Sequence, residues 1–240
     1  VIDNCTDDTK EVIEGYKVEV FETVNNRNKK SGAINQALNY YNLKSEYLLI
    51  MDADTVLEDN AIEEAVRYLE ARPKYASVCS KAGVLKPDKT NFLWHMQNIE
   101  YSHFDTDRVE TNGFILVSHG MFSMYRIKVF KELFKNRGYI YDEDCITEDY
   151  ELTLAIKHLG YRLGASEKIK AYTKVPMSLK ELWIQRTRWM SGGLYAISKY
   201  KFNKYTYKDK CSHYLFGIIW TIQIYLLVIT IIYRYSPVGL

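Results

Sequence analysis

Two aspartates, Asp52 and Asp54, directly follow the apolar run 47–51. Such a run is typical of a buried strand in a parallel sheet, and open α/β sheets bind ligands at the carboxyl ends of these strands. Alternate residues of an extended segment point to the same side, so both carboxylates can converge on one divalent cation. The pattern predicts a Mg²⁺ or Mn²⁺ site that holds a diphosphate. A polar turn after a strand is the alternative interpretation.

Two other acidic segments have the same spacing in a different context. Asp-Thr-Asp at 105–107 and Asp-Glu-Asp at 142–144 do not follow a buried apolar strand. We therefore interpret both as solvated or capping clusters. Their context leaves Asp52 and Asp54 as the candidate metal ligands.

A further acidic pair, Glu148 and Asp149, opens a predicted helix with Thr147 as its N-cap and Gly160 just past its end. The positive end of the helix dipole should keep Asp149 ionised at neutral pH. An ionised carboxylate can accept a hydroxyl proton, so Asp149 is a candidate general base, and Glu148 is better suited to orient. Alternatively, these residues form an ordinary helix start in which both acids only favour the dipole.

A third motif contains Gln185, Arg188 and Trp189, whose spacing puts them on one face of a helix. The helix is expected to begin after Pro176, at the capping-box pattern in 178–181. An arginine fork suits a diphosphate, and an indole offers a stacking surface. A surface salt bridge and a core aromatic are the alternative roles of Arg188 and Trp189.

Alternating strand and helix signals in the first half predict a parallel sheet covered by helices on both faces. Strands are expected at 17–22, 47–51 and 76–82, with helices beginning at Ser31 and Asp59. The less regular second half is typical of an α+β arrangement. There we expect helices at 92–107 and 127–134 and a strand near 113–117. The expected class is α/β, a mostly parallel mixed sheet flanked by helices.

The chain has 240 residues, of which 47% are hydrophobic, enough for one substantial core. A formal net charge of +2 gives no bulk field that would draw the chain to nucleic acid. The four cysteines show neither C-x-x-C nor zinc-ligand spacing, which favours a reduced compartment. No signal-peptide pattern opens the chain, and its start within an expected strand end is typical of a fragment.

Residues 214–233 contain no charged side chain. A helix of this length spans roughly 30 Å, the thickness of a bilayer core, so we expect a transmembrane helix, with a buried core helix as the alternative. The lysines before it are Lys199, Lys201, Lys204, Lys208 and Lys210, and only Arg234 follows. The positive-inside rule then places the globular part in the cytoplasm. We expect this part to span 1–205, followed by a juxtamembrane and transmembrane segment at 206–240.

Taken together and in this order, the motifs resemble glycosyltransferase family 2, and within it the membrane-bound processive synthases such as cellulose and poly-N-acetylglucosamine synthases. Residues 1–9 resemble the family's first nucleotide-binding turn, and 30–35 resemble its K-x-G-x-x-N segment. The resemblance covers nearly the whole chain. It implies the GT-A fold, a Rossmann-like domain that binds a nucleotide sugar, without the strand that normally precedes residue 1.

The resemblance also implies residue roles. The donor and its Mg²⁺ or Mn²⁺ would be bound by Asp3, Lys30, Asp52, Asp54, Gln185 and Arg188, with both Asp52 and Asp54 as metal ligands and Asp3 near the uracil or ribose. Asp149 corresponds to the base of the family's T-E-D motif, with Glu148 beside it. Trp189, and Gly120 in the loop 117–122, would contact the acceptor.

The implied function is that of an inverting glycosyltransferase in the cell membrane, with its catalytic domain facing the cytoplasm. It would move a sugar from a UDP-sugar donor to a glycan acceptor, a growing polysaccharide, alone or with synthase subunits that the sequence does not identify. A nonprocessive relative acting once on a lipid or protein is one alternative. A noncatalytic, membrane-tethered domain that binds nucleotide sugar or glycan is another, and a nucleotidyltransferase, which would not need Gln185, Arg188 and Trp189, is a third.

Overall fold

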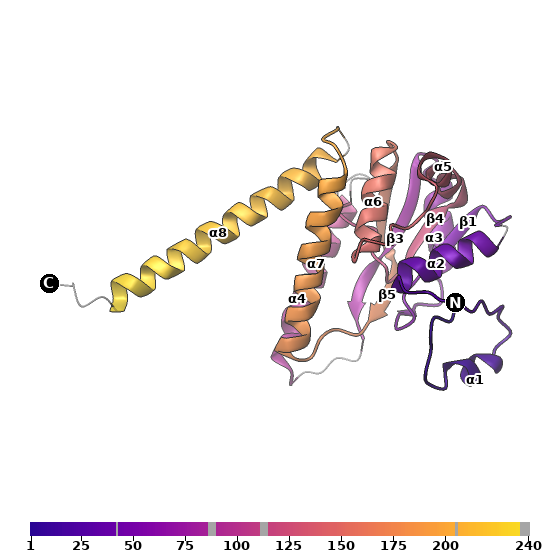
Figure 1. Ribbon diagram of the computed structural model, residues 1–240, viewed down its shortest axis with the longest axis horizontal. Coiled ribbons are helices and arrows are strands. Elements are labelled where there is room, and N and C mark those ends of the chain that lie inside the picture. The colour runs from indigo at the N-terminus through magenta and orange to yellow at the C-terminus, as the bar shows by residue number, and fades with distance from the viewer. Residues whose placement is uncertain (42, 86–89, 111–114, 205, 236–240) are drawn as a thin grey trace. The chain divides into compact units, whose positions relative to one another are not determined.

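The computed structural model describes residues 1–41, 43–85, 90–110, 115–204 and 206–235. The chain divides into two compact units, 1–200 and 201–240. The strands are β1 (Tyr47–Ile50), β2 (Val56–Leu57), β3 (Tyr75–Val84), β4 (Ser123–Arg126) and β5 (Arg162–Thr173). The helices are α1 (Thr9–Glu14), α2 (Lys29–Tyr40), α3 (Ala61–Glu70), α4 (Phe92–Glu110), α5 (Ile127–Arg137), α6 (Glu148–His158), α7 (Leu179–Lys199) and α8 (Tyr207–Tyr235) (Figure 1).

The first unit is built on one mixed sheet with the strand order β1-β4-β3-β5-β2. Strands β3 and β5 pair in parallel, whereas β4 is antiparallel to both β1 and β3, and β2 is antiparallel to β5. Strands β1, β3 and β5 therefore run in the same direction. The expected mixed α/β sheet flanked by helices is confirmed.

Two hydrophobic clusters fill the two sides of this sheet. Leu48 and Ile50 of β1 join the cluster that contains residues of α2, α5 and α6, whereas Tyr47 and Leu49 join the cluster that contains residues of α3. Side chains alternate across a strand, so a continuously apolar strand must be covered on both faces. The helix layers thus fix the end of β1, and with it the position of Asp52.

The sequence patterns located some strands wrongly. Residues 17–22 form no regular strand, and only an isolated parallel bridge joins Glu22 to Ile2. Of the strand expected near 113–117, residues 113 and 114 lie outside the described residues, and 115–117 are not in a strand. The strand in this part of the chain is β4, whose four residues are all buried. Strands β2 and β5 were not predicted, because β2 has only two residues and the polar exposed positions of β5 obscure its alternation.

The two predicted helix caps had different outcomes. Ser178 caps α7 as expected, because its side chain accepts a 3.2 Å hydrogen bond from the backbone N–H of Glu181. The Glu181 carboxylate in turn accepts a 3.2 Å bond from the N–H of Met177. Thr147 occupies the N-cap position of α6 as expected, but its side chain makes no capping bond.

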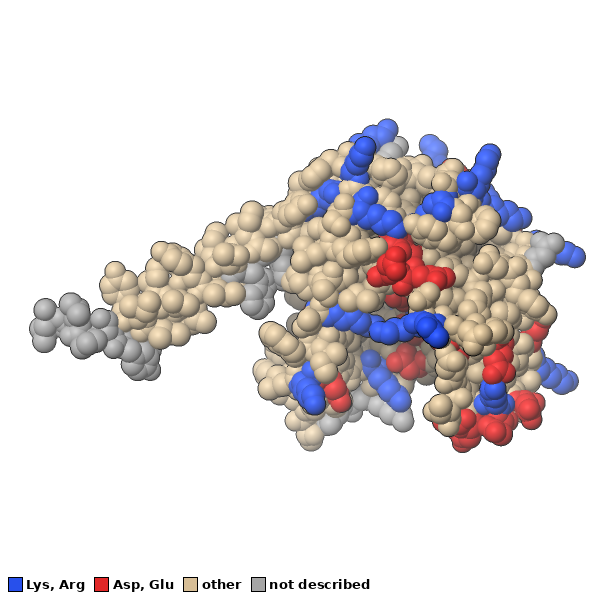
Figure 2. All heavy atoms as spheres, in the orientation of Figure 1, with Lys and Arg blue, Asp and Glu red and all other residues tan. Residues whose placement is uncertain are grey.

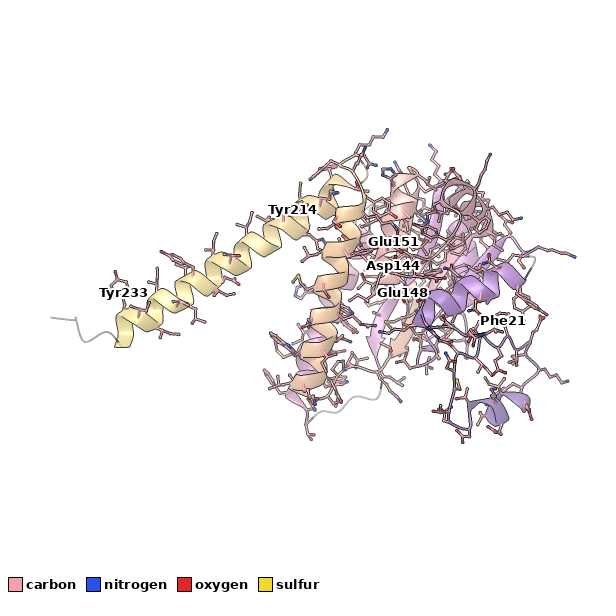
Figure 3. The ribbon with its side chains drawn as sticks, in the orientation of Figure 1. Phe21, Asp144, Glu148, Glu151, Tyr214 and Tyr233 are labelled. Carbon is pink, nitrogen blue, oxygen red and sulfur yellow. The ribbon has the colours of Figure 1, made fainter. Side chains whose placement is uncertain are left out.

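The second unit contains α8, which is long and apolar enough over residues 207–233 to cross a membrane. Figure 3 labels Tyr214 and Tyr233, the ends of its uncharged stretch. The hydroxyls of Thr221 and Thr230 donate hydrogen bonds of 2.9 and 2.8 Å to carbonyls one turn earlier in the helix. These donors are therefore satisfied within the helix, as an apolar environment requires.

Candidate active site

Side chains from four separate segments meet beyond the end of β1. Lys30, in the first turn of α2, forms an ion pair with Asp52, and its Nζ lies 3.2 Å from Oε1 of Glu148. Burial lowers the pKa of Lys30, but the negative charges of Glu148 and Asp52 outweigh it and raise that pKa overall. Lys30 is therefore a cation held between two carboxylates. These lie 22 and 118 residues further along the chain, and the fold brings them together.

Asp149 is held by two backbone amides. Gly120 N–H donates to Oδ2 over 3.1 Å, and Tyr150 N–H donates to Oδ1 over 2.8 Å. Burial and then the charge of Glu148 raise the pKa of Asp149 to about 6, although Lys30 and the two amides act to lower it. The carboxylate is still about nine-tenths ionised at pH 7. Burial therefore decides the direction in which the pKa moves.

Gly120 approaches this site so closely that a side chain would disturb it. A Cβ at this position would lie 2.8 Å from Nζ of Lys30 and 3.1 Å from Oδ2 of Asp52. Its backbone amide is meanwhile bonded to Asp149. The structure therefore brings Lys30, Asp52, Gly120, Glu148 and Asp149 together.

Asp54 lies in the turn that follows β1. It is exposed, and its Oδ1 accepts a 3.3 Å hydrogen bond from Thr173 at the end of β5. Across the described ranges, no group of three or more His, Cys, Asp or Glu side chains is arranged to hold a metal. The two aspartates still fit Mg²⁺ or Mn²⁺, because these ions take hard oxygen ligands and are commonly bound by one or two carboxylates plus substrate phosphates.

Asp3 belongs to a neighbouring polar cluster. Its Oδ1 accepts hydrogen bonds from Thr23 Oγ1, at 2.7 Å, and from Asn26 Nδ2, at 2.8 Å. The same Asn26 amide donates to the carbonyl of Lys29 over 2.7 Å. Buried Asn26 thus ties Asp3 to the start of α2, one residue before Lys30. The sequence patterns did not single out Asn26.

The third motif lies on α7. Gln185 is half-buried and has a buried Oε1 without a hydrogen-bond partner, whereas Arg188 is exposed and Trp189 retains 36% of its accessible surface. Helix α7 packs on the start of α6, where a Cβ on Gly192 would lie 2.5 Å from the side chain of Thr147. This close crossing places the motif on the helix next to Asp149.

Arg186 is a residue that the motif analysis missed. Its guanidinium lies 4.3 Å from the centroid of the Trp189 ring and forms a 2.6 Å ion pair with Glu100 of α4. The spacing of Arg186 and Trp189 was a usable signal, because residues three apart in a helix are neighbours. Arg186 therefore fixes one face of the indole and links α7 to α4.

Acidic side chains gather on one face of the first unit, with basic side chains around them (Figure 2). In the same orientation, Figure 3 labels Asp144 and Glu148 in this region. A mixture of this kind suits a ligand that brings both a cation and an anionic diphosphate.

Lys30, Asp52, Asp54 and Asp149 lie at one end of this mixed sheet, and the comparisons identify the class of protein. The chain belongs to glycosyl transferase family group 2, whose sequence pattern matches residues 47–238. It is 28% identical over 199 residues to the poly-β-1,6-N-acetyl-D-glucosamine synthase of Staphylococcus aureus strain COL. It is 27% identical over 197 residues to the synthase of the same name from Staphylococcus epidermidis. Each match covers 80% of this chain and 46% of the relative, so the chain spans about half the length of these curated relatives.

Solved structures share the fold. A mannosyltransferase from Pyrobaculum calidifontis, in complex with GDP-Man and Mn²⁺, aligns with a TM-score of 0.65 and 20% identity, over 88% of this chain and 58% of that one. Residues 1–349 of Staphylococcus aureus TarS align with a TM-score of 0.51 and 14% identity, over 85% of this chain and 56% of that one. At these identities the likeness establishes the GT-A fold.

Proposed function

We propose that this protein transfers a sugar, with inversion, from a nucleotide-sugar donor to a growing polysaccharide. The observation that carries the proposal is Asp149, a carboxylate with a pKa of about 6 that two backbone amides hold beside the Lys30–Asp52 pair. A base whose pKa lies slightly below the working pH is ionised and still basic enough to take a proton.

The donor occupies the side of the site formed by Asp52, Asp54 and Lys30. The two aspartates would hold Mg²⁺ or Mn²⁺, and such an ion would supply positive charge to the diphosphate leaving group. Lys30 supplies a second positive charge to the diphosphate, and Gln185 and Arg188 reach it from α7. Arg188 suits this role because a guanidinium can bond two phosphate oxygens at once. Asp3 lies toward the nucleoside.

Asp149 faces the acceptor. It takes the proton of an acceptor hydroxyl while that oxygen attacks the anomeric carbon, and the nucleoside diphosphate leaves from the opposite face. The new glycosidic bond forms as the sugar–phosphate bond breaks, so the configuration inverts. Glu148 holds Lys30 in place, and Trp189 offers a stacking surface to the acceptor sugar. Gly120 leaves the space between these groups open.

We also propose that α8 spans the membrane, with the first unit on the cytoplasmic side. Its length and composition support a span. Lys201, Lys204 and Lys208 are exposed just before or within its first turn, and such cations favour the cytoplasmic side. The expected boundary at 205 and 206 remains part of this proposal.

The test is transfer by the full-length protein in membrane extracts, with Mn²⁺ and a panel of labelled UDP-sugars. UDP-N-acetylglucosamine is the first donor to try, because the two curated relatives compared above are named for that sugar. We expect a labelled polymer that Asp149→Asn abolishes. Products one sugar long would indicate a nonprocessive enzyme, and donor binding without transfer would contradict the proposed activity.

A further inference from the structure

A cluster of charged side chains surrounds a buried glutamate of α6, away from the candidate active site. Its central residue, Glu151, follows Asp149 by two positions, which corresponds to a rotation of about 200° around the helix. Glu151 is fully buried and is labelled in Figure 3. We call Arg137, Asp142, Glu151, Lys199 and Tyr200 the Glu151 cluster.

The cluster is paired by sign and geometry. Oε1 of Glu151 accepts a 2.7 Å hydrogen bond from Arg137 Nη1 and another bond from the Tyr200 hydroxyl. Nζ of Lys199 lies 3.5 Å from the same oxygen. The cations of Arg137 and Lys199 therefore face the buried carboxylates of Glu151 and Asp142. A buried charge requires a partner of this kind.

Lys199 connects the last turn of α7 to the segment before α6. Its Nζ donates hydrogen bonds of 2.6 Å to Asp142 Oδ2 and 2.8 Å to the hydroxyl of Tyr139. Burial acts to lower the pKa of Lys199, but the bond to Asp142 and its neighbours raise it overall, so the side chain stays charged. This ammonium is therefore bound within the first unit.

The segment 142–144 agrees in part with the expected solvated or capping cluster. Glu143 and Asp144 are exposed, and Asp142 Oδ1 accepts a 3.2 Å hydrogen bond from the N–H of Asp144. Asp142 itself is buried, with only 6% of its accessible surface exposed. Its neighbour Glu143 accepts a 2.9 Å hydrogen bond from Asn35 of α2. The segment before α6 is therefore tied to α2 on one side and to α7 on the other.

Helix α7 is thus held at three points along its length. Arg186 pairs with Glu100, Gly192 packs against Thr147, and Lys199 pairs with Asp142. Arg188 lies between the first two points, about 6 Å along the axis from Gly192. The contact of Lys199 is seven residues beyond Gly192, so it controls the direction of the helix axis.

We propose that the Glu151 cluster is a positioning group for the reaction, which sets α7, and with it Arg188 and Trp189, against the helix that carries Asp149. This inference rests on the proposed function. Buried ion pairs add little net stability compared with apolar side chains of similar volume, but their directional bonds can specify one arrangement. A small displacement of groups that orient a substrate has a large effect on rate.

The test compares three variants of the full-length protein, Lys199→Gln, Lys199→Arg and the exposed control Lys180→Gln. We measure kcat, the acceptor KM, metal-dependent donor binding and hydrogen exchange of the α7 amides. We expect Lys199→Gln to lower kcat/KM for the acceptor by about tenfold or more. Donor binding should weaken as well, because Arg188 moves with α7, and amide exchange should become faster in α7 than in α2. Lys199→Arg should restore much of the loss, and Lys180→Gln should match the wild type.

Tyr200→Phe provides a second variant if Lys199→Gln does not fold, because it removes one hydroxyl and keeps the ring in the core. The same losses are expected, at smaller size. Wild-type acceptor kinetics and wild-type exchange of α7 in the folded variants would overturn the inference. If the wild type transfers no sugar, the proposed function fails, and the exchange measurement alone decides whether the cluster holds α7.

Discussion

The backbone amide of Gly120 donates a 3.1 Å hydrogen bond to Oδ2 of Asp149, 29 residues further along the chain. This bond joins the loop before β4 to the first turn of α6. It also places the proposed base, Asp149, next to Lys30 and Asp52. The side chains of these two residues lie so close to Gly120 that they would touch a Cβ at that position. One glycine therefore orients the base and leaves room beside the donor groups.

Asp149→Asn should abolish sugar transfer and preserve donor binding. The amide has nearly the same shape but cannot accept the acceptor proton, so kcat should fall by about 10²- to 10⁴-fold. Single-turnover transfer and titration with the nucleoside diphosphate measure the two effects separately. Transfer at the wild-type rate would show that another group is the base.

The rate of transfer should rise with pH through about 6, because the proposed base must be deprotonated. Lys30 lowers the pKa of Asp149, so Lys30→Met should move this rise to higher pH. The profile of kcat/KM for the acceptor between pH 5 and 8 measures the shift, with exposed Lys29→Met as the control. If the rise moved to lower pH or did not move, the assigned effect of the Lys30 charge on the pKa of Asp149 would be wrong.

The same pKa predicts how stability depends on pH. The pKa of Asp149 is raised from 3.8 to about 6 on folding, so the folded state holds a proton that the unfolded state has released. Ionised Asp149 therefore destabilises the fold above pH 6, and this effect disappears as pH falls toward 4. The stability of Asp149→Asn relative to the wild type should therefore increase as the pH rises from 4 to 7. Thermal unfolding of both proteins at pH 4 and at pH 7 measures this increase, and a decrease would contradict the raised pKa.

Replacing both Asp52 and Asp54 by Ala should remove metal-dependent donor binding. The two carboxylates supply the proposed protein ligands, and the diphosphate alone binds weakly without the cation that bridges it. Calorimetric titration of the donor with and without Mn²⁺ measures this loss, with exposed Asp59→Ala as the control. Unchanged Mn²⁺ dependence in the double variant would place the metal elsewhere.

Gly120→Ala should weaken donor binding and slow transfer, because the methyl group would displace Lys30 or Asp52. We expect a loss of about tenfold or more in kcat/KM for the donor, the size of effect that a small misplacement of reacting groups produces. Gly15→Ala is the matched control, since its Cβ would make only an ordinary 3.5 Å contact with Val12. Equal kinetics in the two variants would remove Gly120 from the site.

The sequence alone identified the groups that local patterns can show. The apolar run before Asp52 predicted a strand end, Ser178 and Glu181 predicted the start of α7, and the uncharged stretch 214–233 predicted a long apolar helix. Each of these features depends on side-chain periodicity or on a cap a few residues away. Such information is present in a short window of sequence.

Only the tertiary structure decided which groups meet. Three contacts join residues that are far apart in the chain: Lys30 with Asp52, the amide of Gly120 with Asp149, and Lys199 with the buried Asp142. The pKa of Asp149 shows the physical reason, because desolvation and neighbouring charges depend on position in space, and here they outweighed the local helix dipole. The sequence determined which chemical groups are available, and packing decided which of them act together.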